Sequence, residues 1–269
     1  SVDRYEKYYA AYGLDQAFST DAASWSYAYA LTDSLWVVMM DAGIYEPYAE
    51  PFGLIEAQTQ QWLEAVLRQA NDAGIQVLTV SHQSMLPHSE RVTGGYMIVN
   101  WQDISDLLIA NGVRLHLSGH IHVQHIAGKQ GLYDVVLSAL SSHPNQYALV
   151  TFAENGEIQY ETQRLHAENL PQGLPEESKA FFEEVNYYKV LGQLRHSGIS
   201  EENKEAMAAF AARMNAHYYA GTAALAQDEA MQDAAYALWK EQGEDVFWSG
   251  YLQSMVEETL PDMNRLVLP

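Results

Sequence analysis

Two histidines in one short string are the residues of this sequence best suited to chemistry. The string Gly119-His120-Ile121-His122 follows the apolar run from Val113 to Leu117. A strand that feeds a glycine turn can direct imidazoles at positions i and i+2 toward one point, where each offers a lone pair to a metal ion. The spacing therefore predicts His120 and His122 as metal ligands.

A third histidine has the same context upstream. His82 and the serine before it come directly after the β-branched run Ile75 to Val80. Ligands usually bind at the carboxyl ends of strands in layered α/β folds, so two strands that each end in histidine favour a shared site. A lone histidine is more often structural, but His82, His120 and His122 together favour a metal site.

The loop between the two histidine blocks contributes one further candidate. Residues 83–96 form a long segment that contains His88. Loops that follow such strands often line a pocket, so we interpret His88 as a candidate substrate contact. His116 lies inside the second strand and is interpreted as structural, while His125 falls on the wrong side of an extended segment to be a ligand.

These blocks resemble the last two metal-binding blocks of the calcineurin-like metallophosphoesterases. The resemblance rests on Val80-Ser81-His82, a helix, and Leu117-Ser118-Gly119-His120-Ile121-His122, and it extends over about residues 1–165. It implies that His82 and His120 bind one metal of a dinuclear pair and that His122 binds the other. It also implies divalent Mn, Fe or Zn as the cofactor and a small phosphoester as the substrate.

The sequence departs from the family in the blocks that should precede these. No Asp-X-His, Gly-Asp or Gly-Asn occurs before Ser81, although the family takes its bridging aspartate and its remaining ligands from such blocks. We therefore expect the chain to be the C-terminal portion of a longer enzyme, produced by processing or cleavage. The other reading is a descendant that has lost catalysis.

The missing carboxylates matter because two dications must be held about 3.5 to 4 Å apart by a bridging group. Three neutral histidines can hold one borderline metal but supply no negative charge for a second, so at most one metal is expected here. The expected function is thus the C-terminal part of a metal-dependent hydrolase of phosphomonoesters or phosphodiesters, inactive as this isolated chain. The alternative is a catalytically silent metal-binding or protein-interaction module.

The charge balance restricts the partners. The chain carries 35 acidic and 14 basic residues, a net charge of −21. This field repels nucleic-acid phosphates, and no basic patch overrides it, so nucleic acid is excluded as a partner. No apolar stretch reaches the length of a membrane span. The oligomeric state and the compartment stay open, with the family resemblance favouring a bacterial envelope or secreted protein.

Hydrophobic periodicity predicts two parts. By the resemblance, residues 1–168 are expected to be the C-terminal part of a metallophosphoesterase-like domain, and the change to helical periodicity predicts a helical domain at residues 169–269, with a linker at 169–175. The expected fold class is α/β (α+β), a partial layered β-sandwich flanked by helices and followed by an all-α domain.

Single elements are predicted from local patterns. We expect a hairpin at 26–40, helices at 58–73 and from Trp101, and a second hairpin around Asn155-Gly156. In the helical part, four apolar stripes are expected to face inward: Phe181, Phe182, Val185, Tyr188 and Leu191; Met207, Phe210, Ala211 and Met214; Met231, Ala235, Leu238 and Trp239; Val246, Phe247, Tyr251, Leu252 and Met255.

Overall fold

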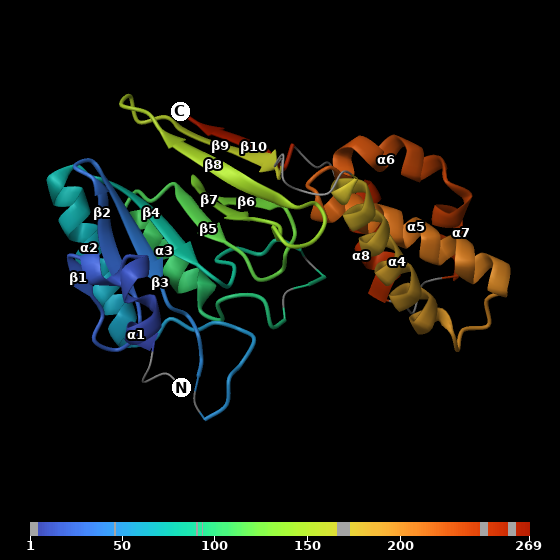
Figure 1. Cartoon of the computed structure of the whole chain (residues 1–269), viewed down its shortest axis with the longest axis horizontal. Helices are drawn as coiled ribbons and strands as arrows, with labels where there is room; N and C mark the ends of the chain where they lie inside the picture. Colours follow the sequence, from blue (N-terminus) through green and yellow to red (C-terminus); the bar gives the residue numbers. More distant parts are fainter. Residues whose placement is uncertain are drawn as a thin grey trace. The chain divides into compact units, whose positions relative to one another are not determined.

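The computed structural model describes residues 5–45, 47–89, 91–92, 94–165, 173–242, 247–257 and 262–269. The chain folds into two compact units (Figure 1). The first unit contains residues 1–121 and 126–136, and the second contains residues 122–125 and 137–269. Within the described ranges, no helix is both long enough and apolar enough to cross a membrane.

The first unit is built on one seven-stranded sheet with the order β1-β2-β3-β4-β5-β7-β6. Strands β3, β4, β5 and β7 run parallel, while β2 pairs with β3 as the predicted antiparallel hairpin. Their near-continuous apolar sequences suit strands that are covered on both faces. The strands are β1 (Ser19–Thr20), β2 (Tyr27–Thr32), β3 (Leu35–Met40), β4 (Gln76–Ser81), β5 (Leu115–Ser118), β6 (His125–Lys129) and β7 (Leu132–Val136).

Two helices supply most of the remaining core of this unit. The first is α2 (Ala57–Ala73), which ends at Gly74 in the left-handed conformation, as its sequence predicted. The second is α3 (Trp101–Ala110), which buries Ile104 and Leu108. Before β1 lie α1 (Tyr5–Tyr9), η2 (Ala10–Tyr12) and η3 (Leu14–Gln16).

Asn100 precedes α3 but its side chain does not cap the helix. Its amide instead accepts from the Ile55 backbone N–H at 3.1 Å and donates to the Ile55 carbonyl at 2.8 Å. The helix-capping residue type is therefore used to fasten the segment before α2 to the start of α3. The predicted start of this helix at Trp101 is confirmed.

The second unit contains a separate three-stranded antiparallel sheet, β10-β9-β8. Strands β8 (Gln146–Phe152) and β9 (Ile158–Arg164) form the hairpin that Asn155-Gly156 predicted, with Gly156 at φ 89°. The third strand, β10 (Arg265–Leu268), pairs with β9. The prediction that helical structure continues to the end of the chain is wrong here. The β8–β9 hairpin has a backbone edge with which the last residues pair as a strand, and short-range periodicity does not reveal such a distant partner.

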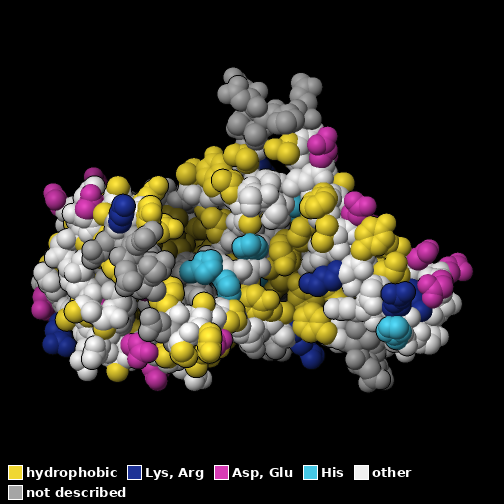
Figure 2. Space-filling model, turned by 60° about the horizontal axis from the view of Figure 1, so that its bottom comes forward, with side chains coloured by type: hydrophobic (Ala, Val, Ile, Leu, Met, Phe, Trp, Pro, Cys, Tyr) yellow, Lys and Arg dark blue, Asp and Glu magenta, His cyan; other side chains and the backbone are white. Residues whose placement is uncertain are grey.

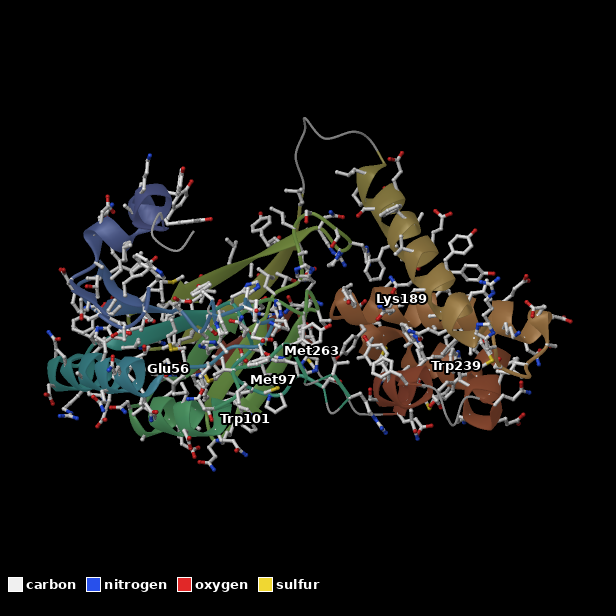
Figure 3. The ribbon with its side chains drawn as sticks, turned by 90° about the horizontal axis from the view of Figure 1, so that it is seen from below. Glu56, Met97, Trp101, Lys189, Trp239 and Met263 are labelled. Atoms are coloured by element: carbon white, nitrogen blue, oxygen red, sulfur yellow. The ribbon has the colours of Figure 1, made fainter. Side chains whose placement is uncertain are left out.

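The helices of the second unit are α4 (Leu174–Leu194), α5 (Glu201–Tyr219), α6 (Ala223–Gln232), α7 (Ala234–Gln242) and α8 (Phe247–Glu257). Helix α5 is central: it buries Met207, Phe210, Ala211 and Met214 as predicted, and Ser200 caps it by accepting from the Asn203 N–H. Trp239 of α7, labelled in Figure 3, is fully buried and donates its indole N–H to the Met207 carbonyl at 2.9 Å.

The stripe predicted for α4 is wrong at three of its five residues. Phe181, Val185 and Tyr188 are 67%, 49% and 62% exposed, whereas the buried residues of this helix are Asn186, Val190 and Leu194. The polar Asn186 lies inside because its amide accepts from Asn215 of α5 at 2.7 Å and donates to the Phe182 carbonyl at 2.8 Å. Met231 and Phe247 are also about half exposed, and Val246 lies outside the described residues.

The mixed α/β class with a C-terminal helical region agrees with the prediction. The predicted boundary between residues 168 and 169 and most of the predicted linker fall in 166–172, outside the described residues. The compact units divide earlier, after Val136, because β8 and β9 pair with β10 rather than with the seven-stranded sheet.

Candidate metal site

The parallel strands of the first unit bring chemistry-bearing residues to one edge of the sheet. In the strand register, Met40 pairs with Ser81 and Val80 pairs with Leu117. Asp41 and His82 therefore follow adjacent strand ends, and the Gly119 N–H donates to the His82 carbonyl at 3.0 Å. This is the arrangement expected for ligand-binding residues of an open α/β sheet.

His82 and His120 face one another at this edge. His120 Nδ1 lies 3.0 Å from His82 Nε2, and the two ring centroids are 4.8 Å apart. The other ring nitrogen of His120, Nε2, lies 3.0 Å from the Gly95 carbonyl, which can only accept. In a neutral ring His120 therefore carries its proton on Nε2 and directs the lone pair of Nδ1 toward His82.

The backbone of the motif is held in an uncommon conformation. His120 has φ 65° and His122 has φ 56°, in the left-handed region that residues other than glycine seldom adopt. Such strain persists only where surrounding structure imposes it, and it concentrates at functional sites. The motif is therefore shaped by its surroundings and not by local preference.

The ring of His120 is also supported from a second side. The Tyr96 ring lies 5.4 Å from it, centroid to centroid. Both Gly95 and Tyr96 belong to the long loop that follows His82. That loop thus orients the ring of His120, which is the kind of second contact that fixes a histidine ligand.

The structure brings together two of the three predicted ligands, His82 and His120. His82 and His120 lie in the first unit, while His122 belongs to the second. No three His, Asp or Glu side chains among the described residues converge in a way that could hold a metal ion. The assignment of His82, His120 and His122 as ligands stays a prediction.

His88, the predicted substrate contact, is a buried residue, and its role toward a substrate stays a prediction. It is 5% exposed, and its Nε2 lies 3.1 Å from the Asp134 carboxylate. Asp134 also accepts from the backbone N–H groups of Met85 and Leu86 at 2.7 and 2.8 Å, and from the Ser118 hydroxyl at 2.6 Å. Asp134 therefore fastens the loop after His82 to the strand that leads into His120.

Burial alone would raise the pKa of Asp134. The neighbouring His88 ring and the hydrogen bonds from His88 and Ser118 outweigh it and hold the pKa at about 2. Sequence reasoning missed this residue, although a charged side chain inside the apolar strand Leu132–Val136 is a usable signal. A carboxylate buried inside a sheet that is covered on both faces needs several hydrogen-bond donors around it.

His116 has the structural role that its place in the strand indicated. Its Nδ1 lies 2.8 Å from the Thr79 hydroxyl and its Nε2 lies 2.9 Å from the Ser81 hydroxyl. Ser81 donates its own proton to the Gln83 carbonyl, so Nε2 of His116 carries the proton and Thr79 donates to Nδ1. Burial, the largest influence, lowers the pKa of His116 and keeps the ring neutral.

A cavity of about 570 Å³ adjoins this edge of the sheet. His82 and Asp41 both line it, together with the aromatic rings of Trp25, Tyr27 and Tyr45. The Asp41 carboxylate accepts from the Trp25 and Gly43 N–H groups and from the Tyr45 hydroxyl, at 3.2, 2.9 and 2.7 Å. Figure 2 shows exposed histidine side chains, in cyan, on the face that is turned forward.

Residues 173–262 match the family described as the C-terminal domain of cyclic nucleotide phosphodiesterase. No curated protein matches the sequence. Among solved structures, a dimetal phosphatase from Danio rerio is similar at 15% identity with a TM-score of 0.44, over 52% of this chain and 58% of that one. The Plasmodium protein GAP50, described as the anchor in the inner membrane complex, is similar at 12% identity with a TM-score of 0.37, over 58% of this chain and 60% of that one. This chain thus spans less than two thirds of either protein.

Proposed function

We propose that this chain supplies the histidine side of a metal-dependent phosphoesterase site that hydrolyses phosphodiesters. The observation that carries the proposal is the His82–His120 pair, whose ring nitrogens converge at 3.0 Å. The match of residues 173–262 to the C-terminal domain of cyclic nucleotide phosphodiesterase supports it independently, because it concerns a different part of the chain.

The residues present fit a borderline divalent metal such as Mn, Fe or Zn. Two neutral imidazoles are suitable ligands, and the Gly95 carbonyl orients His120 through its second nitrogen. A metal held there would polarise a phosphoryl oxygen and lower the pKa of bound water. His82 and His120 would bind the metal and the Gly95 carbonyl would orient His120, while Asp134 holds the loop after His82 to strand β5; His122 is a further proposed ligand.

The ligand set of these residues is incomplete for two metals. The described residues form no group of three ligands, and histidines alone supply no bridging negative charge. The chain by itself should therefore retain metal weakly and turn over no phosphodiester. Among the described residues no carboxylate completes the histidine pair, so a working two-metal site would need further ligands.

A direct test measures metal content and hydrolysis together. After dialysis with manganese or zinc, elemental analysis should detect weak retention by the chain and less by His120→Ala. His196→Ala, which removes an exposed histidine elsewhere, is the matched control and should change nothing. Bis-p-nitrophenyl phosphate should not be hydrolysed by the chain alone.

The same assay on the complete product of the gene separates the two function classes. Phosphodiesterase activity that is lost in His120→Ala supports the enzyme. Metal retention without any turnover in that complete product would support the alternative, a catalytically silent metal-binding or interaction module. Turnover that survives His120→Ala would refute the metal assignment.

A further inference from the structure

A second cavity lies wholly within the second unit and has a different chemical character. Its volume is about 340 Å³, within the range of small-ligand sites. It forms where β8 begins, β9 ends, α4 begins and α5 ends. Its lining includes His143, Asn145, Arg164, Lys179, His217 and Thr222.

The lining is cationic in a strongly acidic protein. The chain has 35 acidic residues against 14 basic ones, yet Arg164 and Lys179 line this cavity with Glu176 as the one carboxylate in its lining. Arg164 uses Nη1 to donate to the Pro144 carbonyl at 2.7 Å, and its other N–H groups have no partner among the described residues. Lys179, which lines the cavity, forms an ion pair with Glu183. A free guanidinium fork is suited to anionic oxygens.

Asn145 adds an unsatisfied acceptor. It is 9% exposed and has φ 54°, and its Nδ2 donates to the Leu140 carbonyl at 3.1 Å. Its Oδ1 is buried and has no hydrogen-bond partner within the described residues. A buried acceptor without a partner is unfavourable, so a ligand that donates a proton to this oxygen would be stabilised by the hydrogen bond.

Two histidines complete the wall. His143 lies with Nε2 3.2 Å from the Ala216 carbonyl, and His217 lies with Nδ1 3.0 Å from the Thr222 hydroxyl. Burial is the main cause that lowers the pKa of both rings. Lys179 lowers the pKa of both further, and Arg164 lowers that of His143. Glu183 raises the pKa of both rings, and Glu229 raises that of His217. An anion in the cavity would counter the effect of the two cations on both rings.

We propose that this cavity binds a phosphate group that still carries a proton, either inorganic phosphate or a small phosphate monoester. Its anionic oxygens accept from Arg164 and Lys179, and its P–OH, or a neighbouring hydroxyl of an ester, donates to Asn145 Oδ1. The site uses no metal and none of the residues of the first unit. A negative result for this phosphate site would therefore not bear on the proposed phosphoesterase site, and the reverse also holds.

Sulfate provides a stringent comparison because it has the shape and charge of phosphate but carries no proton near neutral pH. Isothermal titration of the whole chain at pH 7 should show inorganic phosphate binding about tenfold or more tighter than sulfate, the effect of one hydrogen bond to a charged partner. Glycerol 3-phosphate, titrated in parallel, distinguishes a monoester from the free ion as the better ligand. Equal binding of phosphate and sulfate would refute the role of Asn145.

Two substitutions test the named groups. Asn145→Gly tolerates the positive φ, removes the acceptor and should abolish the preference for phosphate over sulfate. Arg164→Gln should weaken phosphate binding about tenfold or more, and Arg164→Lys should restore part of it. Arg265→Gln, at an exposed arginine outside the cavity, should leave binding unchanged.

A second readout reports binding even if the heat is small. Proton resonances of the His143 and His217 rings, assigned by substitution, should titrate at higher pH when phosphate is present, and the ring of exposed His196 should not change. Absence of both heat and ring shifts at millimolar phosphate would overturn the proposal. So would an equal loss of binding in Arg164→Gln and Arg265→Gln.

Discussion

His88 and Asp134 form a solvent-excluded pair in which the imidazole Nε2 lies 3.1 Å from a carboxylate oxygen. The same carboxylate receives two backbone N–H groups of the loop after His82 and the hydroxyl of Ser118. The buried Asp134 side chain thus holds two backbone groups that lie 49 and 48 residues before it in the chain. Asp134 therefore joins the loop after His82 to the strand that precedes His120.

Removing the carboxylate should therefore be costly. Asp134→Ala leaves the Met85 and Leu86 N–H groups and His88 without their acceptor, and we expect a loss of about 3–5 kcal/mol in the free energy of unfolding. Urea denaturation followed by circular dichroism measures it. Asp106→Ala is the control, since the exposed Asp106–Lys129 ion pair should contribute less than about 1 kcal/mol. Similar losses in the two variants would contradict the buried role.

Stability should fall on acidification in two stages. The pKa of His116 is below its ordinary 6.5 in the folded chain, so the unfolded chain binds a proton first and stability declines as the pH falls below 6.5. The pKa of Asp134 is about 2 against an ordinary 3.8, so its contribution is present above 3.8 and is lost as the pH falls toward 2. Urea midpoints between pH 8 and 3 would reveal both stages, and the first should shrink in His116→Gln.

The burial pattern of α4 can be tested by paired truncations. Leu194→Ala removes a fully buried side chain and should cost about 2–5 kcal/mol. Phe181→Ala removes a larger side chain that is 67% exposed and should change stability by no more than about 0.5 kcal/mol. A large loss for Phe181→Ala in denaturant titrations would restore the stripe that periodicity alone predicted.

Gly221 should not tolerate a side chain. Its φ is 68°, and an added Cβ would lie 2.7 Å from Gln124 Cγ and 2.9 Å from Asn264 Nδ2. We expect Gly221→Ala to destabilise the protein by about 1–3 kcal/mol, because strain and overlap add. Gly198→Ala has open space around it and should be close to neutral. Thermal melts of the two variants provide the comparison.

Local patterns in the sequence were sufficient for much of the first unit. The helix from Ala57 to Gly74 and the strands that end near His82 and His120 follow from hydrophobic period and glycine position. The pair His82 and His120 followed from the same logic, because parallel strands place their carboxyl ends at one edge. The bounds of these elements follow from residues that are close together in the sequence.

What could not be predicted depends on partners distant in the chain. The role of Asp134 is defined by donors in another loop, and the inward face of α4 is defined by Asn215 on α5. Asn100 has a capping residue type yet serves Ile55, 45 residues away. In each case tertiary packing overrode local preference, as it commonly does for polar residues that find a buried partner.

The pairing of β9 with β10 has a consequence for how the second unit assembles. Leu268 lies opposite Ile158, and Arg265 opposite Glu161, so about a hundred residues separate the two strands in the chain. On a ribosome, the entire helical region must be synthesised before β9 acquires this neighbour, and contacts of such sequence separation form slowly. Until then β9 offers an unprotected edge to any other strand, which makes a nascent chain stalled within α5 to α8 the species most exposed to aggregation.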